Sequence, residues 1–183
     1  SSRASVARAL RQRDAELVQS EARKQVAAGA SYLSVNAAAL LGEETEHLLW
    51  LVDTVQAAVD CPLCLDSPDP DAIAAAMARH RGRALLNSIT GERHKYSRLL
   101  PLVAEYRPRV VALCLDDGGT PPTAQGRADI AGRLIEGLTG QGLALDGIFI
   151  DPLIYPISVD GAAVRVVLET LESARQRGAP IYA

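Results

Sequence analysis

The sequence predicts an α/β fold in which parallel strands alternate with helices. Short, uninterrupted apolar runs recur along the chain, and each is followed by a longer segment whose apolar residues return every three or four positions. Continuous apolar strands are typical of parallel sheets, which helices cover and connect by crossovers. The aromatic content is only 4%, so Ala, Leu, Val and Ile must fill a layered core.

The composition narrows the class of protein. The chain has 183 residues, of which 48% are hydrophobic, and its formal net charge is −3. A mildly acidic chain lacks the positive surface on which nucleic-acid binders depend, so we expect no nucleic-acid partner. No run approaches the roughly 18 apolar residues of a membrane span, so we expect no membrane partner either. The three cysteines do not suggest a disulfide framework, and the cytoplasm is the expected location.

The first half of the chain begins with a helical pattern over 3–28, which Asp14 can interrupt and cap. Asp69 and Pro70 have the form of an N-cap and first-turn proline for a helix through His80. Spacings of four, three and four between apolar residues predict a further helix over 43–59. Strands are predicted at 32–36, 62–66 and 83–87.

The second half repeats the alternation. Helices are predicted at 92–106, 124–141 and 160–177 from their apolar spacing. Strands are predicted at 109–115 and 148–151, and a further one begins at 179.

Two architectures fit this alternation, an open doubly wound sheet and a (β/α)8 barrel. The repeat of about 29 residues suits a barrel of about 250 residues, and this chain is shorter. It also begins on a helix and finishes on a predicted strand. The residue pattern alone leaves both architectures open.

Five successive predicted strands finish on an amide or a carboxylate, and ligands of parallel α/β folds bind at this edge of the sheet. The side chains are Asn36, Asp66, Asn87, Asp116 (followed by Asp117) and Asp151. The alternative is that Asp and Asn only form turns and helix caps there. Separate caps at Asp69 and Asp160 weaken that alternative for the set as a whole.

A group of Asp and Asn without His or Lys has a chemical preference. These side chains accept hydrogen bonds from N–H groups, and the amides also donate. They match a flat heterocycle that carries an amino group and a ring N–H beside a carbonyl, such as a pterin or guanine. They do not match a phosphate, which favours Gly-rich backbone and Arg or Lys.

A family resemblance runs along nearly the whole chain, and its most specific motifs are LDS, LNS and IDPL at strand ends. The segments are AAGASYLSVN (27–36), CPLCLDSPDPDAI (61–73), GRALLNSITGE (82–92), VVALCLDDGGTPPTAQGR (110–127) and FIDPLIYPIS (149–158). In these segments the chain resembles the pterin-binding methyltransferase family. That family includes methyltetrahydrofolate:corrinoid protein methyltransferases and the folate domain of cobalamin-dependent methionine synthase, and dihydropteroate synthase is a more distant relative. The resemblance implies the barrel, as a single domain over 1–183 that lacks its first strand and its last βα unit.

The resemblance implies roles for the strand-end residues. Asp151 would accept from the pterin amino group and ring N–H, Asn87 and Asp66 would bond the other edge, and Asn36 would be an amide of the inner rim. Asp116 is a further expected substrate contact because it closes its strand. The family's Asn beside N5 would lie just after Ala183, so the catalytic residue is not identified in this chain.

The implied reaction moves a methyl group from N5 of methyltetrahydrofolate to the cobalt of a corrinoid, or in reverse. The signature D-x-H-x-x-G of cobalamin-binding domains is missing, so a partner protein or domain would carry the corrinoid. The family also implies a homodimer.

The chain departs from the family pattern at three places. Ser34 stands where the family usually has Asp, Ala37 and Ala38 replace a Gly-containing turn, and Gly118 stands where a Lys is often found. A non-catalytic pterin-binding or scaffold domain is therefore one alternative. A dihydropteroate synthase-like condensation is another, disfavoured because the loops lack the basic and Gly-rich elements that hold a pyrophosphate.

The cysteines and histidines point to no metal centre. Cys61 and Cys64 flank a predicted strand, where residues three apart face opposite sides, and Cys114 has the setting of a core residue. We therefore expect no metal and no redox pair. His47, His80 and His94 fall on helices or helix starts, and we expect them to be solvated or to cap.

Overall fold

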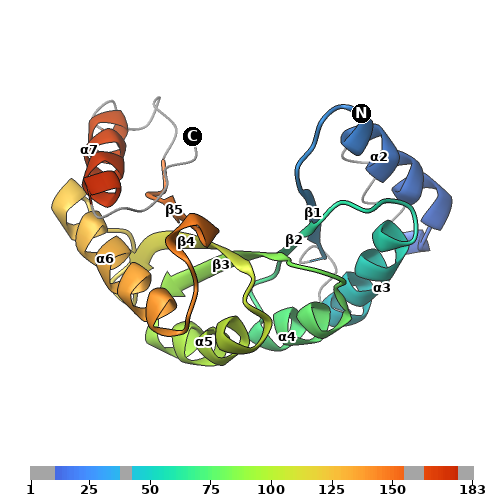
Figure 1. Cartoon of the computed structure of the whole chain (residues 1–183), viewed down its shortest axis with the longest axis horizontal. Helices are drawn as coiled ribbons and strands as arrows, with labels where there is room; N and C mark the ends of the chain where they lie inside the picture. Colours follow the sequence, from blue (N-terminus) through green and yellow to red (C-terminus); the bar gives the residue numbers. More distant parts are fainter. Residues whose placement is uncertain (1–10, 38–42, 155–162, 177–183) are drawn as a thin grey trace. The chain divides into compact units, whose positions relative to one another are not determined.

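The computed structural model describes residues 11–37, 43–154 and 163–176. Helices and strands alternate along the described ranges (Figure 1), as α2 (Ala15–Ala27), β1 (Leu33–Asn36), α3 (Glu44–Gln56), β2 (Leu63–Asp66), α4 (Pro70–Arg79), β3 (Leu85–Gly91), α5 (Arg93–Tyr106), β4 (Arg109–Asp116), α6 (Ala124–Gly140), η1 (Leu145–Gly147), β5 (Ile148–Asp151) and α7 (Ala163–Gln176). The strand order in the sheet follows the chain, and the pairings β1–β2, β2–β3 and β4–β5 are parallel. The predicted α/β class is confirmed.

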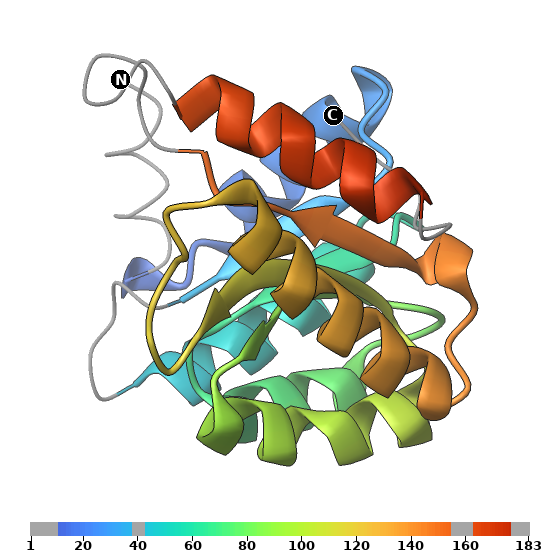
Figure 2. The same ribbon diagram turned by 90° about the vertical axis from the view of Figure 1, so that its left-hand side faces the viewer.

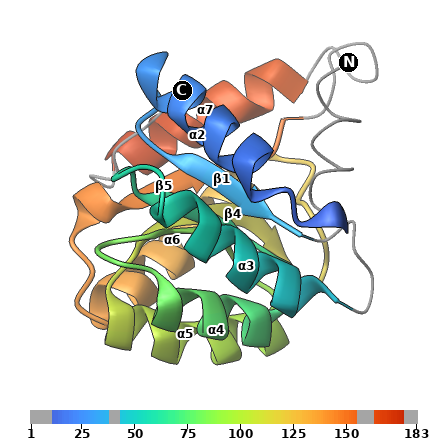
Figure 3. The same cartoon turned by 90° about the vertical axis from the view of Figure 1, so that its right-hand side faces the viewer.

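The chain divides into two compact units, 1–87 and 88–183. In the first unit the helices α2 and α4 lie on either side of α3 (Figure 3). Leu48 and Val52 of α3, Leu63 and Leu65 of β2 and Ile73 of α4 are almost completely buried and form its core. These are the apolar positions at helical or strand spacing that the sequence pattern assigns to the inside.

Two predicted helix starts in the first unit are confirmed. The Asp14 carboxylate accepts from Leu17 N at 3.0 Å at the start of α2. The Asp69 carboxylate accepts from Asp71 N at 2.9 Å, and Pro70 occupies the first turn of α4. Each cap satisfies a backbone donor that the helix itself leaves unpaired.

The second unit packs α6 against β4 and β5, and α7 lies beside α6 (Figure 2). Alternate residues of β4, namely Val110, Ala112 and Cys114, are fully buried on the side of the strand that faces α6. Ile130, Leu134 and Leu138 of α6 are buried as well. Among the described residues of this unit the buried core is aliphatic, as the low aromatic content of the chain predicts.

The strand β3 differs from its prediction. The sequence predicts it at 83–87, but it runs from Leu85 to Gly91, because Ile89 and Thr90 are β-branched and buried and extend the strand. Asn87 therefore lies inside β3 rather than at its end. Glycine allows a close approach at position 91, since a Cβ there would lie 3.0 Å from the Leu115 carbonyl oxygen and would force β4 to shift by a few tenths of an ångström.

Smaller differences concern helix ends and one histidine. The helix α3 ends at Gln56 rather than at 59. His47 is buried rather than solvated, and its Nε2 lies 3.1 Å from a Glu43 carboxylate oxygen. The predicted strand from 179, the first residues of the helix expected at 160–177 and the cap at Asp160 lie outside the described residues. Among the described helices, we find none with the length and apolar character needed to cross a membrane.

Candidate functional site

Three of the predicted site residues share one level of the sheet in the first unit. Asn36 of β1 pairs with Asp66 of β2, and Asp66 pairs with Asn87 of β3. Directly paired residues of parallel strands project to the same face, and neighbouring strands lie about 4.8 Å apart. The three polar side chains therefore form a row across the sheet. We call them the Asn36–Asp66–Asn87 row.

The row lies on the face of the sheet opposite the helices. Leu33 and Val35 of β1 are buried, whereas the alternate residues Ser34 and Asn36 are exposed. Asp66 and Asn87 are half-buried. Within the described ranges, neither the Asp66 carboxylate nor the Asn87 side-chain amide has a hydrogen-bond partner. Two acceptor oxygens and one amide that both donates and accepts are thus available to a ligand at this level.

The backbone that follows Asp66 is fixed by a buried serine. The Ser67 hydroxyl donates to a Glu44 carboxylate oxygen at the start of α3 and accepts from Asp69 N at 3.0 Å. Asp69 in turn caps α4. The end of β2 is therefore tied to the starts of two helices, which holds Asp66 in place on a rigid base.

In the second unit, Asp151 closes β5 and pairs with Leu113 of β4. Its Oδ1 accepts from Leu153 N at 2.8 Å. No partner of its Oδ2 lies among the described residues. One oxygen of this carboxylate is used by the protein, and the other is available to a donor from outside.

The structure places Asp116 differently from Asp151. Side chains alternate along a strand, so Asp116 lies on the same side of β4 as Val110, Ala112 and Cys114, the side that faces α6. Its Oδ2 accepts from Arg133 Nη2 at 2.8 Å, and its Oδ1 accepts from Gly118 N at 3.0 Å. The carboxylate is thus engaged within the protein, on the opposite face of β4 from Leu113.

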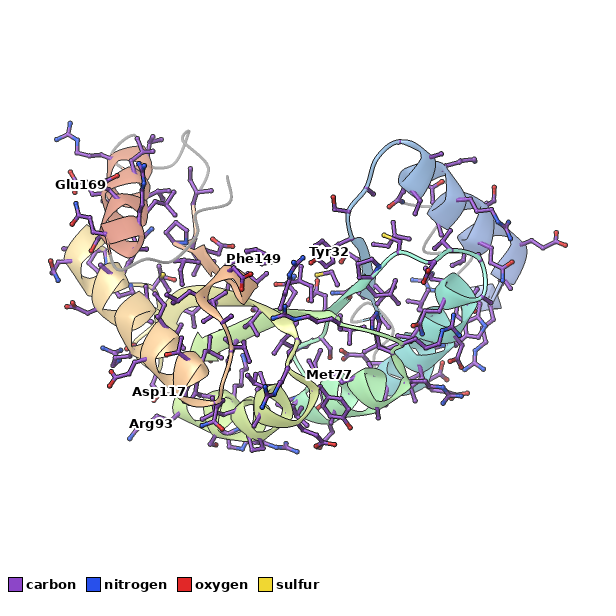
Figure 4. All side chains as sticks on the ribbon, in the orientation of Figure 1. Tyr32, Met77, Arg93, Asp117, Phe149 and Glu169 are labelled. Atoms are coloured by element: carbon purple, nitrogen blue, oxygen red, sulfur yellow. The ribbon has the colours of Figure 1, made fainter. Side chains whose placement is uncertain are left out.

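The neighbouring Asp117 is also paired. Its Oδ2 lies 2.7 Å from Arg93 Nε, and Figure 4 shows the two side chains next to each other. The hydrogen bond and the charge of the Arg93 guanidinium hold the pKa of Asp117 below its ordinary value. Arg93 is almost fully exposed, so this pair adds little to the free energy of folding.

Comparison with known proteins decides the family. The family model described as "Pterin binding enzyme" matches residues 2–182. The chain belongs to this family. The resemblance stated from the strand-end motifs is therefore confirmed, and with it the barrel of the pterin-binding type.

Curated relatives of this pterin-binding chain are methyltransferases. The methylcorrinoid:tetrahydrofolate methyltransferase of Eubacterium limosum is 32% identical over 173 residues, which cover 93% of this chain and 64% of that protein. The methionine synthase of Mycobacterium tuberculosis (strain ATCC 25618 / H37Rv) is 34% identical over 122 residues, which cover 63% of this chain and 10% of that protein. The chain thus spans less than two thirds of either relative.

Solved structures agree on the fold. Dihydropteroate synthase from Xanthomonas albilineans in complex with 7,8-dihydropteroate matches with a TM-score of 0.63 at 20% identity, over 92% of this chain and 60% of that one. Dihydropteroate synthase from Thermus thermophilus matches with a TM-score of 0.65 at 20% identity, over 89% of this chain and 64% of that one. At this identity the likeness concerns the fold alone.

Two of the cysteines of this pterin-binding chain, Cys64 and Cys114, are buried thiols, and Cys61 is half-buried. Burial, with a contribution from the nearby Asp66 charge, raises the pKa of Cys64 to about 11, although a hydrogen bond with Ser34 lowers it. Burial and the charge of Asp151 raise the pKa of Cys114 to about 12. Among the described residues, no group of three or more His, Cys, Asp or Glu side chains could hold a metal ion.

Sequence reasoning missed Arg127. This arginine of α6 is only 4% exposed, and its guanidinium donates to three backbone carbonyls: Pro121 O at 2.8 Å, Pro152 O at 2.8 Å and Leu153 O at 2.9 Å. A signal was present in the sequence. Arg127 precedes Ile130 and Leu134 by three and seven positions, so it falls on the apolar face of its helix.

Proposed function

We propose that this chain binds the pterin ring of a reduced folate. The paired residues Asp66 and Asn87 carry the proposal, because they present unpartnered hydrogen-bonding groups at one level of the sheet. The family and its named methyltransferase relatives support the same ligand. A pterin edge offers an amino group, ring N–H groups and a carbonyl, and an adjacent carboxylate and amide complement such an edge.

The resemblance assigns pterin contacts to Asp66 and Asn87 in the first unit and to Asp151 in the second, and we propose each of them as such a contact. Asp151 would use its available Oδ2, since its Oδ1 already accepts from Leu153 N. Asn36 and Asp116 stay predictions from the sequence.

For the whole protein, we propose methyl transfer between N5 of methyltetrahydrofolate and the cobalt of a corrinoid carried by a partner protein or domain. In the forward direction Co(I) supplies the electron pair of the new Co–C bond, and the C–N5 bond breaks with its electrons staying on N5. Because a tertiary amine is a poor leaving group, N5 must be protonated or hydrogen-bonded as this bond breaks, and with that proton tetrahydrofolate leaves as a secondary amine. The protein has to align the methyl group with the cobalt, which is a proximity effect.

The physiological direction is part of this proposal. The name of the Eubacterium limosum relative describes transfer from a methylcorrinoid to tetrahydrofolate. We therefore propose that both directions are open to the protein, and that the relative concentrations of the two methyl donors set the net flux. A homodimer and a cytoplasmic location stay predictions from the sequence.

A non-catalytic pterin-binding domain is the second candidate, and Ser34 favours it. Ser34 faces the same side of the sheet as Asn36 and pairs with Cys64, at a position where the family usually has a carboxylate. A hydroxyl in place of a carboxylate removes one strong acceptor from the face that would bind the ligand. This candidate predicts pterin binding without methyl transfer.

A calorimetric titration of the full-length protein tests the proposal. We expect saturable binding of methyltetrahydrofolate and of tetrahydrofolate, and no binding of p-aminobenzoylglutamate, the part of folate that lacks the pterin. Absence of binding by either folate, or equal binding of p-aminobenzoylglutamate, would contradict the pterin site. Methyl transfer to cob(I)alamin, followed by its absorbance, then separates the enzyme from the non-catalytic domain.

A further inference from the structure

The guanidinium of Arg127 joins two loops of the second unit. Its Nε donates to the carbonyl of Pro121, in the segment between β4 and α6. Its Nη1 donates to the carbonyls of Pro152 and Leu153, directly after β5. One buried side chain thus fixes the backbone that follows both strands.

The Pro121 side of this link is tightly packed. A Cβ on Gly126 would lie 2.8 Å from Pro121 Cβ, so the proline ring rests directly on the first turn of α6. The Thr123 hydroxyl caps the same turn and accepts from Gly126 N at 3.2 Å. Arg127 therefore starts from a rigid base, which α6 and its cap provide.

The other side of the link fixes the orientation of the Asp151 carboxylate. Leu153 has a φ of +62°, in the left-handed region that a leucine rarely adopts. In this conformation its N–H donates to Asp151 Oδ1 at 2.8 Å while its carbonyl accepts from Arg127 Nη1 at 2.9 Å. The same residue thus connects the buried guanidinium to the carboxylate at the end of β5.

The chemistry of arginine suits this position. Burying a guanidinium is costly unless its donors are satisfied, and here the acceptors are carbonyl oxygens, with no ion pair to a carboxylate in the described part of the chain. The planar fork of arginine can donate to both sides at once, whereas the point charge of lysine cannot. Arg127 and Asp151 both act on the pKa of Cys114, in opposite directions, which places the two charges near the same thiol.

We infer that Arg127 is a positioning residue for Asp151: through Leu153 it orients the carboxylate so that Oδ2 faces a pterin donor. Arg127 itself touches no ligand. The inference deepens the proposed function and rests on it for the identity of the ligand. The orientation of the carboxylate, however, is a property of the protein alone.

The ligand-free arm of the test is hydrogen exchange of the Leu153 amide, measured by NMR on the full-length protein. In the wild type we expect this amide to be protected, because it donates to Asp151. In Arg127→Lys and Arg127→Met we expect protection to fall by about tenfold or more. Arg165→Met, which removes an exposed arginine of α7, is the matched control and leaves the amide unchanged. An unprotected Leu153 amide in the wild type overturns the inference without any variant.

The ligand arm is a double-mutant cycle on the affinity for methyltetrahydrofolate. We expect Arg127→Lys alone to weaken binding by about tenfold, and to cause no further loss in the Asp151→Ala background. Such non-additivity separates action through Asp151 from a general loss of stability. Losses that simply add in the double variant overturn the inference.

The two arms separate the two claims. A wild type that binds no folate but protects the Leu153 amide through Arg127 contradicts the proposed function and leaves the positioning role supported. A wild type that binds folate with additive losses contradicts the positioning role alone. If Arg127→Met does not fold, Arg127→Lys still tests the positioning role, because lysine keeps the buried positive charge.

Discussion

Asp66 and Asn87 occupy directly paired positions on the parallel strands β2 and β3. A carboxylate and an amide at one level of a sheet, with no partner among the described residues, form an edge with three acceptor oxygens and one NH2 donor group. Asn36 extends this level on the far side of Asp66. The relationship is set by the strand register and not by loop conformation, so it provides a rigid base for a flat ligand.

Gly137 of α6 is predicted to accept a side chain only at a cost, because the Tyr96 side chain would have to move. A Cβ there would overlap the Tyr96 hydroxyl, whereas a Cβ on Gly140 of the same helix meets nothing within 4 Å. Gly→Ala in a helix ordinarily stabilises by up to about 1 kcal/mol, and overpacking costs about 1–3 kcal/mol. We expect Gly140→Ala to be neutral or stabilising and Gly137→Ala to lower the free energy of unfolding by about 1–2 kcal/mol.

Urea denaturation of the two variants measures this difference. In the background Tyr96→Leu, which removes the hydroxyl, the penalty of Gly137→Ala should largely disappear. Equal stabilisation by both alanines in the wild-type background would be inconsistent with the packing of Tyr96 onto α6.

Of the three thiols, Cys61 is predicted to be the one that is alkylated in the native protein. The thiolate is the nucleophile, and pKa values of about 11 for Cys64 and about 12 for Cys114 leave about 0.1% or less of either as thiolate at pH 8. Burial also raises the pKa of Cys61, but this thiol is only half-buried. In the native protein we expect one thiol to react with iodoacetamide at pH 8, and Cys61→Ser to abolish that reaction.

The same pKa values predict a loss of stability in base. Unfolded thiols ionise near pH 9, and the folded ones do so only at higher pH, so the unfolded chain releases protons first as the pH rises. The free energy of unfolding should therefore fall from about pH 9 upward. In Cys64→Ser this fall should be smaller, and an unchanged pH profile would argue against a buried, protonated Cys64.

His80 is predicted to stabilise the protein only while it is neutral. Its Nε2 accepts from Leu63 N at 3.1 Å, at the buried start of β2, and burial together with the charge of Arg81 lowers its pKa. The contribution is therefore complete above the unfolded pKa of about 6.5 and is lost as the pH falls through the lower folded pKa.

We expect His80→Ala to cost about 1 kcal/mol of unfolding free energy at pH 8, and less at pH 5. His94→Ala, at an exposed position of α5, serves as the control and should have little effect at either pH. Urea denaturation at the two pH values checks the prediction. A cost of His80→Ala that does not depend on pH would rule out the neutral acceptor role.

Much of the fold follows from local pattern. The caps at Asp14 and Asp69 were predictable because a short polar side chain before an apolar period satisfies helix donors. The end of β3 was not, since Asn87 has the type of residue that closes the other strands, while Ile89 and Thr90 carry the strand further. A polar residue such as Asn87 therefore predicts the end of a strand less precisely than the β-branched residues that follow it.

The sequence proposes the residues of the candidate site, and their surroundings were harder to predict. Asp66, Asn87 and Asp151 were proposed from their predicted place at strand ends and from the family motifs, although Asn87 lies inside β3. The partners of Asp116 were not foreseen, because Arg133 lies a full strand–helix connection away in the sequence. Arg127 was missed because the acceptors of a buried arginine are backbone carbonyls, which no sequence motif displays.

The most direct test of the pterin site compares Asp66→Asn with Asp60→Asn by calorimetric titration with methyltetrahydrofolate. Asp60 is exposed and precedes the amino end of β2, whereas Asp66 is the last residue of this strand. Loss of a charge-assisted hydrogen bond costs about 1.5–3 kcal/mol, so we predict that Asp66→Asn weakens binding by about tenfold or more. Asp60→Asn should leave the affinity unchanged. Equal affinity in the two variants would contradict the central claim that Asp66, paired with Asn87, binds the pterin.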